Sequence, residues 1–102
     1  MELVASIYDI TQHFPKEEIY GLTAQLRRAA VSIPSNVAEG AARNGSKEFT
    51  HFLGIAKGSL SELETQLLIS ARLGYMEREN PVFSQLEEVS RLLFGLQKSL
   101  AK

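Results

Sequence analysis

Residues 22–43 read LTAQLRRAAVSIPSNVAEGAAR and carry an apolar stripe at helical spacing. Its members are Leu22, Leu26, Ala29, Ile33, Val37 and Ala41. A recurrence every three or four residues places these side chains on one face of an α-helix. Pro34 stands inside the segment, where a proline removes one backbone hydrogen bond and crowds the carbonyl four residues earlier. Because the stripe stays in phase on both sides of Pro34, we expect one kinked helix rather than two helices.

Three further helices are expected around this one. The first covers residues 2–13, the third covers residues 46–73, and the fourth begins at Asn80. Ser46 and Asn80 are favourable N-cap residues, and Gly74 suits the left-handed position that ends a helix. The fourth helix carries a heptad seam. The seam consists of Val82, Leu86, Val89, Leu93, Leu96 and Leu100.

Short connections between consecutive helices require antiparallel neighbours. The sequence therefore predicts an all-α fold, an antiparallel up-down-up-down four-helix bundle, with residues 1–102 forming a single domain. No stretch alternates with a period of two, so strands are not expected. The first helix is shorter than the third. We therefore expect part of the core, at Leu60 and Leu63, to lack its fourth wall.

Composition narrows the classes of protein that the chain could represent. It has 102 residues, no cysteine and a net charge of −1. Disulfides and cysteine-based zinc sites are excluded, and a cytoplasmic location is the default expectation. No apolar run is long enough to cross a membrane, and the N-terminus lacks the features of a signal peptide. Basic residues outnumber acidic ones only in residues 23–47, so an anion-binding face is expected there.

A second stripe on residues 22–43 is polar. It consists of Gln25, Arg28, Ser32, Asn36, Glu39 and Arg43. The third helix offers Ser59, Glu62 and Gln66 as partners. One interpretation is a solvated helix face. The other is a close-packed interface, which the many small residues on both helices favour. Under the second interpretation Arg28, Asn36 and Glu62 are buried and hydrogen-bonded to one another or across a subunit boundary.

Catalytic and metal-binding chemistry is not expected. Glu48 and His51 have the Glu-x-x-His spacing of di-iron bundle proteins, but those sites need two such motifs. The other histidine, His13, has Ile10 where the glutamate of a second motif would stand. His51 is also expected to point away from the core. We therefore predict a protein that is not an enzyme and has no cofactor or metal.

Two segments resemble signatures of a bacterial four-helix bundle protein family that is encoded in or near intervening sequences of 23S rRNA genes. The first is FPKEEIYGLTAQLRRAAVSIPSNVAEG at residues 14–40, and the second combines KEF at 47–49 with FLGIAKGSLSELETQL at 52–67. The resemblance implies a pentameric barrel of bundles. It extends to the accessory variability determinant of diversity-generating retroelements, which binds a reverse transcriptase and nucleic acid. Family members usually carry further residues before the position of Met1, which complete the first helix.

Two functions remain open from the sequence. The first is a homo-oligomer, by resemblance a pentamer, whose second and third helices form the subunit interface and which binds RNA or another nucleic acid. The basic residues proposed for that contact are Arg27, Arg43, Lys47 and Lys57. The second is an oligomeric scaffold for a protein partner, such as a nucleic-acid-handling protein, with no direct nucleic-acid contact. Apolar residues outside the main seams, Ile55, Ile69 and Leu92, favour self-association in both cases. No membrane partner is expected.

Overall fold

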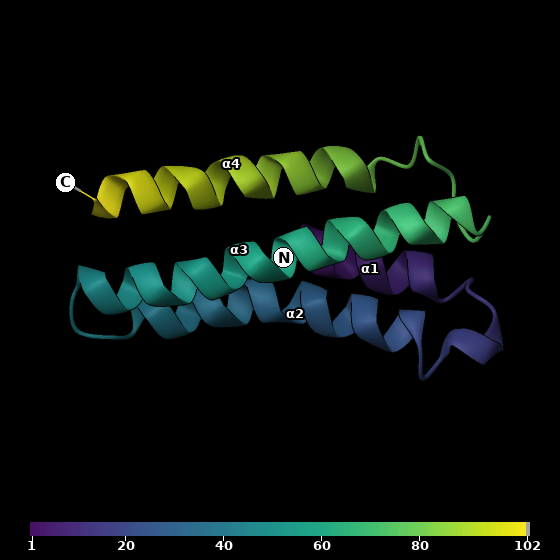
Figure 1. The fold of residues 1–102 in the computed structure, drawn as a ribbon, viewed down its shortest axis with the longest axis horizontal. Helices are drawn as coiled ribbons and strands as arrows, with labels where there is room; N and C mark the ends of the chain where they lie inside the picture. The colour runs from purple at the N-terminus through teal and green to yellow at the C-terminus, as the bar shows by residue number, and fades with distance from the viewer. Residues whose placement is uncertain (102) are drawn as a thin grey trace.

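The computed structural model describes residues 1–101 as four α-helices joined by short turns (Figure 1). The helices are α1 (Glu2–Thr11), α2 (Leu22–Ala41), α3 (Ser46–Arg72) and α4 (Val82–Leu100), with a short 3-10 helix η1 (Lys16–Glu18) between α1 and α2. Consecutive helices run in opposite directions, and each of α1 and α3 contacts both α2 and α4. The predicted all-α, up-down-up-down four-helix bundle is confirmed. None of the helices in this part of the chain is both long and apolar enough to cross a membrane.

Pro34 lies inside α2 without ending it. Ile33 is fully buried on one side of the proline, and Val37 packs against the core on the other side. Packing on both sides therefore holds the helix together across the missing backbone donor. The expectation of one helix rather than two across Pro34 is confirmed, and the helix ends at Ala41 rather than at the expected Arg43.

The helices begin and end at residues that favour turns. Gly45 and Gly74 both have positive φ, at 113° and 82°, and they follow α2 and α3. Ser46 was expected as the N-cap of α3, but Gly45 holds that position and no side chain caps the helix. Asn80 was expected as the N-cap of α4, but Pro81 holds that position. The Asn80 Oδ1 still accepts a hydrogen bond of 2.9 Å from the backbone N–H of Val82, the first residue of the helix.

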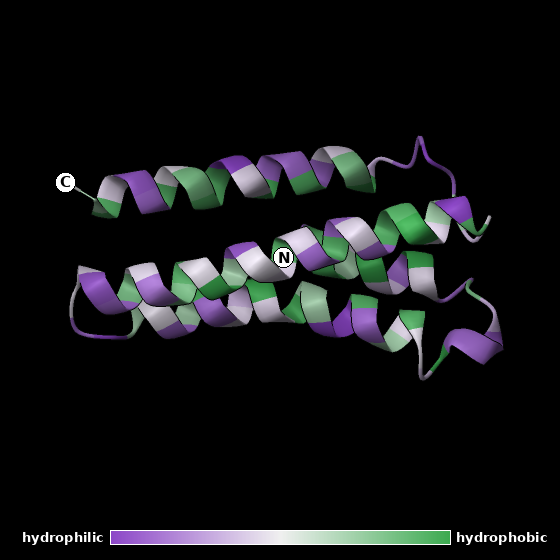
Figure 2. Ribbon diagram, viewed as in Figure 1, coloured by the Kyte–Doolittle hydropathy of each residue, from purple (hydrophilic) through white to green (hydrophobic). Residues whose placement is uncertain are grey.

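The core runs between the four helices, and hydrophobic residues recur along each helix in Figure 2. The expectation that Leu60 and Leu63 lack a fourth wall is wrong, because their exposed fractions are 9% and 0%. These residues lie on the inner face of α3. The consequence of the short α1 appears elsewhere: α1 accompanies only one half of the bundle in Figure 1, and the surface left open lies between α2 and α4.

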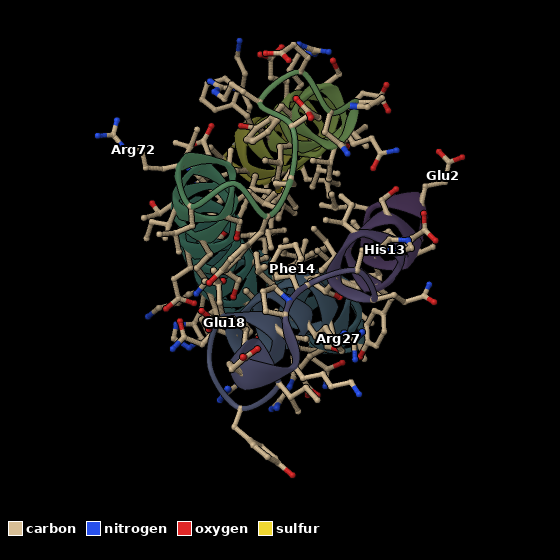
Figure 3. All side chains as sticks on the ribbon, turned by 90° about the vertical axis from the view of Figure 1, so that its right-hand side faces the viewer. Glu2, His13, Phe14, Glu18, Arg27 and Arg72 are labelled. Carbon is tan, nitrogen blue, oxygen red and sulfur yellow. The ribbon has the colours of Figure 1, made fainter. Side chains whose placement is uncertain are left out.

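A polar and aromatic cluster closes the end of the bundle where α1 joins α2. The Phe14 ring lies in the centre of this end in Figure 3, and its centroid is 5.3 Å from that of Tyr75. The Tyr75 hydroxyl donates a 2.9 Å hydrogen bond to the carboxylate of Glu18. The other oxygen of Glu18 accepts a bond from the N–H of Leu22 at the start of α2. Glu18 therefore links the 3-10 turn, α2 and the segment after α3.

This bond changes the titration of Tyr75. Donation to the Glu18 carboxylate, together with partial burial, raises the pKa of Tyr75 above its usual value. The bond therefore contributes stability that is fully present below the ordinary tyrosine pKa and is lost as the pH rises through the raised value.

We expect Tyr75 to ionise above the ordinary range of a tyrosine in an alkaline titration followed by tyrosinate absorbance. Glu18→Gln should lower its pKa, because the substitution removes the negative charge that opposes ionisation. Loss of one transition in Tyr75→Phe identifies the transition that belongs to Tyr75. An unchanged Tyr75 transition in Glu18→Gln would contradict the contact.

Candidate functional site

A polar groove of about 490 Å³ lies between α2 and α3. Its lining consists of Gln25, Arg28, Ala29, Ser32, Ser59, Glu62 and Gln66. The hydroxyls of Ser32 and Ser59 form its floor, 2.8 Å apart, and Asn36 donates to the Ser32 hydroxyl over 2.9 Å. The sequence thus predicted correctly that polar residues of these two helices lie together.

Gln66 brings an unsatisfied acceptor into the groove. Its Oε1 is buried and has no hydrogen-bond partner among the described residues. Its amide nitrogen reaches the Gln25 Oε1 only at 3.5 Å, the outer limit for a hydrogen bond. A buried acceptor without a partner costs about 1–3 kcal/mol.

The charged residues of the groove do not meet in one chain. Arg28 on α2 and Glu62 on α3 are both exposed, and no ion pair joins them. The expectation that they are buried is therefore wrong for the single chain. The close approach of Ser32 and Ser59 at the floor leaves no room for longer side chains between the helices. Burial of Arg28 and Glu62 between two chains stays a prediction.

The other end of the polar stripe has a different environment. Arg43 forms a 2.7 Å ion pair with Glu39, one helical turn earlier, and lies 3.8 Å from Glu48. Its guanidinium lies 5.1 Å from the centre of the Phe52 ring. Glu39 and Arg43 therefore pair with each other at the end of α2 and the start of the α2–α3 turn, and neither lines the groove.

The four basic residues proposed for nucleic-acid contact do not form one patch. Arg27 donates a 2.9 Å hydrogen bond to Thr11 and lies over the Tyr8 ring, so it holds α1 against α2 (Figure 3). Lys57 donates a 2.8 Å bond to Gln97 and so links α3 to α4. These two residues contact helices on different sides of the bundle. Only the two that flank the α2–α3 turn, at positions 43 and 47, lie close together in the chain.

The outer face of α3 adds apolar and small residues beside the polar groove. Ile55, Ile69 and Leu73 are exposed there. A Cβ added at Gly54 or Gly58 would meet nothing within 4 Å. The expected excess of apolar residues is confirmed at Ile55 and Ile69. Together with the groove, these residues form one surface, which we call the α2–α3 face. It carries charged side chains, a polar atom without a hydrogen-bond partner, exposed apolar side chains, and glycines that leave room for a second chain to approach closely.

The glycines of α2 and α3 provide a direct stability test. A Cβ at Gly40 would lie 2.9 Å from side-chain atoms of both Phe49 and Phe52, where α2 meets α3. Gly40→Ala should therefore lower the free energy of unfolding by about 1–2 kcal/mol, despite the better helix propensity of alanine. Gly58→Ala, in open space on α3, should raise it by up to about 1 kcal/mol in the isolated chain. Urea unfolding at low protein concentration measures both, and equal signs would contradict the packing.

The Glu48-x-x-His51 spacing leads to no metal cluster. His51 is exposed, as expected, and its ring meets the Phe52 ring edge to face, with the ring centroids 5.2 Å apart. No group of three or more potential metal ligands occurs among residues 1–101.

An apolar groove between α2 and α4 was not predicted from the sequence. It has a volume of about 320 Å³ and opens beside Met1. Its lining from the two helices consists of Ile33, Pro34, Val37, Ala38, Ala41, Val89, Leu92, Leu93 and Leu96. Leu92, an apolar residue outside the heptad seam of the fourth helix, was the feature of the sequence that pointed to this surface.

Comparison with known protein families identifies a match over most of the chain. A family model described as "23S rRNA-intervening sequence protein" matches residues 1–95, which is nearly the whole chain. No curated protein matches the chain.

Proposed function

The chain belongs to the 23S rRNA-intervening sequence protein family, and we propose that it acts as a homo-oligomeric helical scaffold assembled through the α2–α3 face. The observation that carries this proposal is the polar groove. It is lined by Arg28 and Glu62, which have opposite charges, are both exposed and form no ion pair with each other, and by Gln66, whose buried Oε1 has no partner among the described residues. A second copy that supplies opposite charges would pair with Arg28 and Glu62.

The composition of the α2–α3 face favours a heterologous contact, in which two different patches meet. The α2 side carries Arg28, whereas the α3 side carries Glu62 beside exposed Ile55 and Ile69. Heterologous contacts close into rings when the rotation between copies divides a full turn. A ring of five copies is the assembly that the resemblance implies, and the spacing of residues does not count subunits. In this proposal the protein has a binding role and catalyses no reaction.

Sedimentation equilibrium of the purified protein at micromolar concentration tests the assembly. We expect a mass of several chains, with five as the number implied by the resemblance. A mass equal to one chain throughout the concentration series would reject the scaffold.

RNA binding is the second candidate function, and the α2–α3 turn favours it. Arg43 and Lys47 are exposed there, and a ring would repeat them in every subunit, so that weak sites add through avidity. Arg43 already lies within ion-pair distance of the carboxylates of Glu39 and Glu48, which compete with a phosphate group for its guanidinium. The competing possibility is a protein partner, with no nucleic-acid contact.

A salt series with total RNA distinguishes these two partners. If RNA binds at the turn, the double variant Arg43→Ala, Lys47→Ala should bind RNA more weakly than the wild type at the same salt concentration. It should also reduce the slope of log K against log salt by about 1.4, because two phosphate contacts are lost. Arg27 and Lys57 stay unchanged in this variant, because they hold the helices together. If the variant and the wild type bind RNA with equal affinity and equal salt dependence, the RNA site lies elsewhere. If the wild type binds no RNA, a protein partner is favoured.

A further inference from the structure

A hollow of about 300 Å³ lies between α3 and α4, which run antiparallel side by side (Figure 1). The core residues Leu60 and Leu86 line it, together with hydroxyl and charged side chains of both helices. One of these is Glu64, two residues after Glu62, and a step of two residues turns an α-helix by about 200°. The hollow therefore opens on a different side of α3 from the α2–α3 face.

Phe94 projects from α4 beside this hollow, with 60% of its surface exposed. It follows Ser90 by four residues and Arg91 by three, and both of those line the hollow. Phe94 therefore lies one helical turn further along the same side of α4, without lining the hollow itself. A projecting ring and a hollow side by side on one surface can match a copy of that surface turned by half a rotation.

The charge of this surface, the α3–α4 face, changes sign along its length. The end beyond Phe94 is basic, with the exposed Lys98 and with Lys57, which donates to Gln97. The hollow is lined by the exposed Glu64 and Glu87. A parallel copy would place like charges together, whereas an antiparallel copy would place the basic end of each chain over the acidic hollow of the other. The charges thus fit a second, antiparallel copy.

The spacing along α4 sets the register of such a pair. Glu87, Arg91, Phe94 and Lys98 follow one another at four, three and four residues, so they lie on one side of the helix. If Lys98 lies opposite Glu87 of an antiparallel copy, Phe94 lies opposite Arg91, because both pairs have the same midpoint.

This register also gives Arg91 favourable neighbours. Within the chain its guanidinium lies 3.9 Å from the Glu87 carboxylate, in an exposed ion pair that contributes little by itself. In the pair, the Phe94 ring of the other copy would lie against this guanidinium, an arrangement that attracts a cation to an aromatic face. The two Arg91 side chains come near each other at the centre, where each keeps the Glu87 carboxylate of its own chain.

We propose that two copies of the chain pair through antiparallel α3–α4 faces, so that Phe94 of each copy packs over the hollow of the other and Lys98 pairs with Glu87. The contact is isologous, because the same residues serve on both copies. It does not rest on the proposed assembly through the α2–α3 face, which uses another side of α3. Where both contacts form, the α3–α4 contact joins two rings.

Sedimentation equilibrium tests the pairing in a parent chain that carries Glu62→Arg, so that the proposed α2–α3 contact does not contribute. We expect the parent to have the mass of two chains and Phe94→Lys to halve it, because the added cation faces Arg91 of the other copy. Leu92→Lys is the matched control. Leu92 is 66% exposed on the same helix but lies about 200° around it from Phe94, so the mass should not change.

Helix content by circular dichroism should stay the same in both variants, because both side chains are exposed. A parent mass of one chain, an unchanged mass for Phe94→Lys, or an equal loss for Leu92→Lys overturns the proposal.

Mixing two charge variants tests the antiparallel register. Lys98→Glu and Glu87→Lys, each in the Glu62→Arg parent, should dissociate at concentrations where the parent is paired, because like charges then face each other twice in every pair. An equal mixture should pair again, since the introduced glutamate faces the introduced lysine and the native Lys98 faces the native Glu87. Pairing of either variant alone, or no pairing in the mixture, overturns the proposal. A failure of the α2–α3 assembly would leave these results unchanged, so the two ideas can fail separately.

Discussion

Leu63→Ala should lower the free energy of unfolding by about 3 kcal/mol, within the usual range of about 2–5 kcal/mol for such substitutions. Leu63 has no exposed surface and lies in the middle of α3, among the residues that form the core. The substitution removes buried methyl groups and leaves a cavity that the helices on either side can close only in part. Urea unfolding measures the change, at one fixed protein concentration, because assembly of the chains would add to the apparent stability.

Leu68→Ala is the matched control, because it makes the same chemical change five residues further along α3. The Leu68 side chain is 40% exposed, so its truncation should cost less than about 1 kcal/mol. If the two variants unfold at the same urea concentration, Leu63 does not occupy the centre of the core. Equal unfolding midpoints would instead support the expectation that Leu63 is only partly covered by the other helices.

The helices themselves could be predicted from the sequence because each inner face follows the helical period. The stripe through Leu26 and Ile33 predicted α2 across Pro34, and Gly74, which has positive φ, coincides with the expected end of α3. The sequence did not reveal which neighbours a short α1 would leave uncovered. That depends on the order of the helices around the bundle and on where α1 begins along α2, and both are set by tertiary packing.

The candidate site was predictable in part for a similar reason. Spacing placed Ser32 and Ser59 on facing helices, and the structure brings their hydroxyls within hydrogen-bond distance. Spacing could not show that the helices approach so closely that Arg28 remains at the rim. Nor could it show that Arg27, the next residue, reaches Thr11 on α1 rather than solvent. The residue types were visible in the sequence, whereas the lengths of side chains relative to the gaps between helices were not.

The largest change in assembly should come from reversing the charges of the α2–α3 face. In the proposed contact, Glu62 of one copy faces Arg28 of the next. Glu62→Arg or Arg28→Glu alone would place like charges together in that contact, at a cost of several kcal/mol per interface. We expect each single variant to sediment as a smaller particle than the wild type at the same concentration. Both residues are exposed in the single chain, so the bundle itself should stay folded by circular dichroism.

The double variant Arg28→Glu and Glu62→Arg gives the more specific result, because it restores opposite charges with their positions exchanged. If the two residues meet across the interface, the double variant should recover much of the wild-type mass, and a double-mutant cycle should show a favourable coupling. Glu88→Arg serves as the control. Glu88 is exposed on α4 and lines a groove toward α1, outside both proposed contacts, so its reversal should not change the mass. Recovery could not occur if Arg28 and Glu62 contacted different partners. A double variant that stays dissociated, beside a Glu88→Arg protein of wild-type mass, would therefore reject this pairing, although the α2–α3 face could still assemble through other residues.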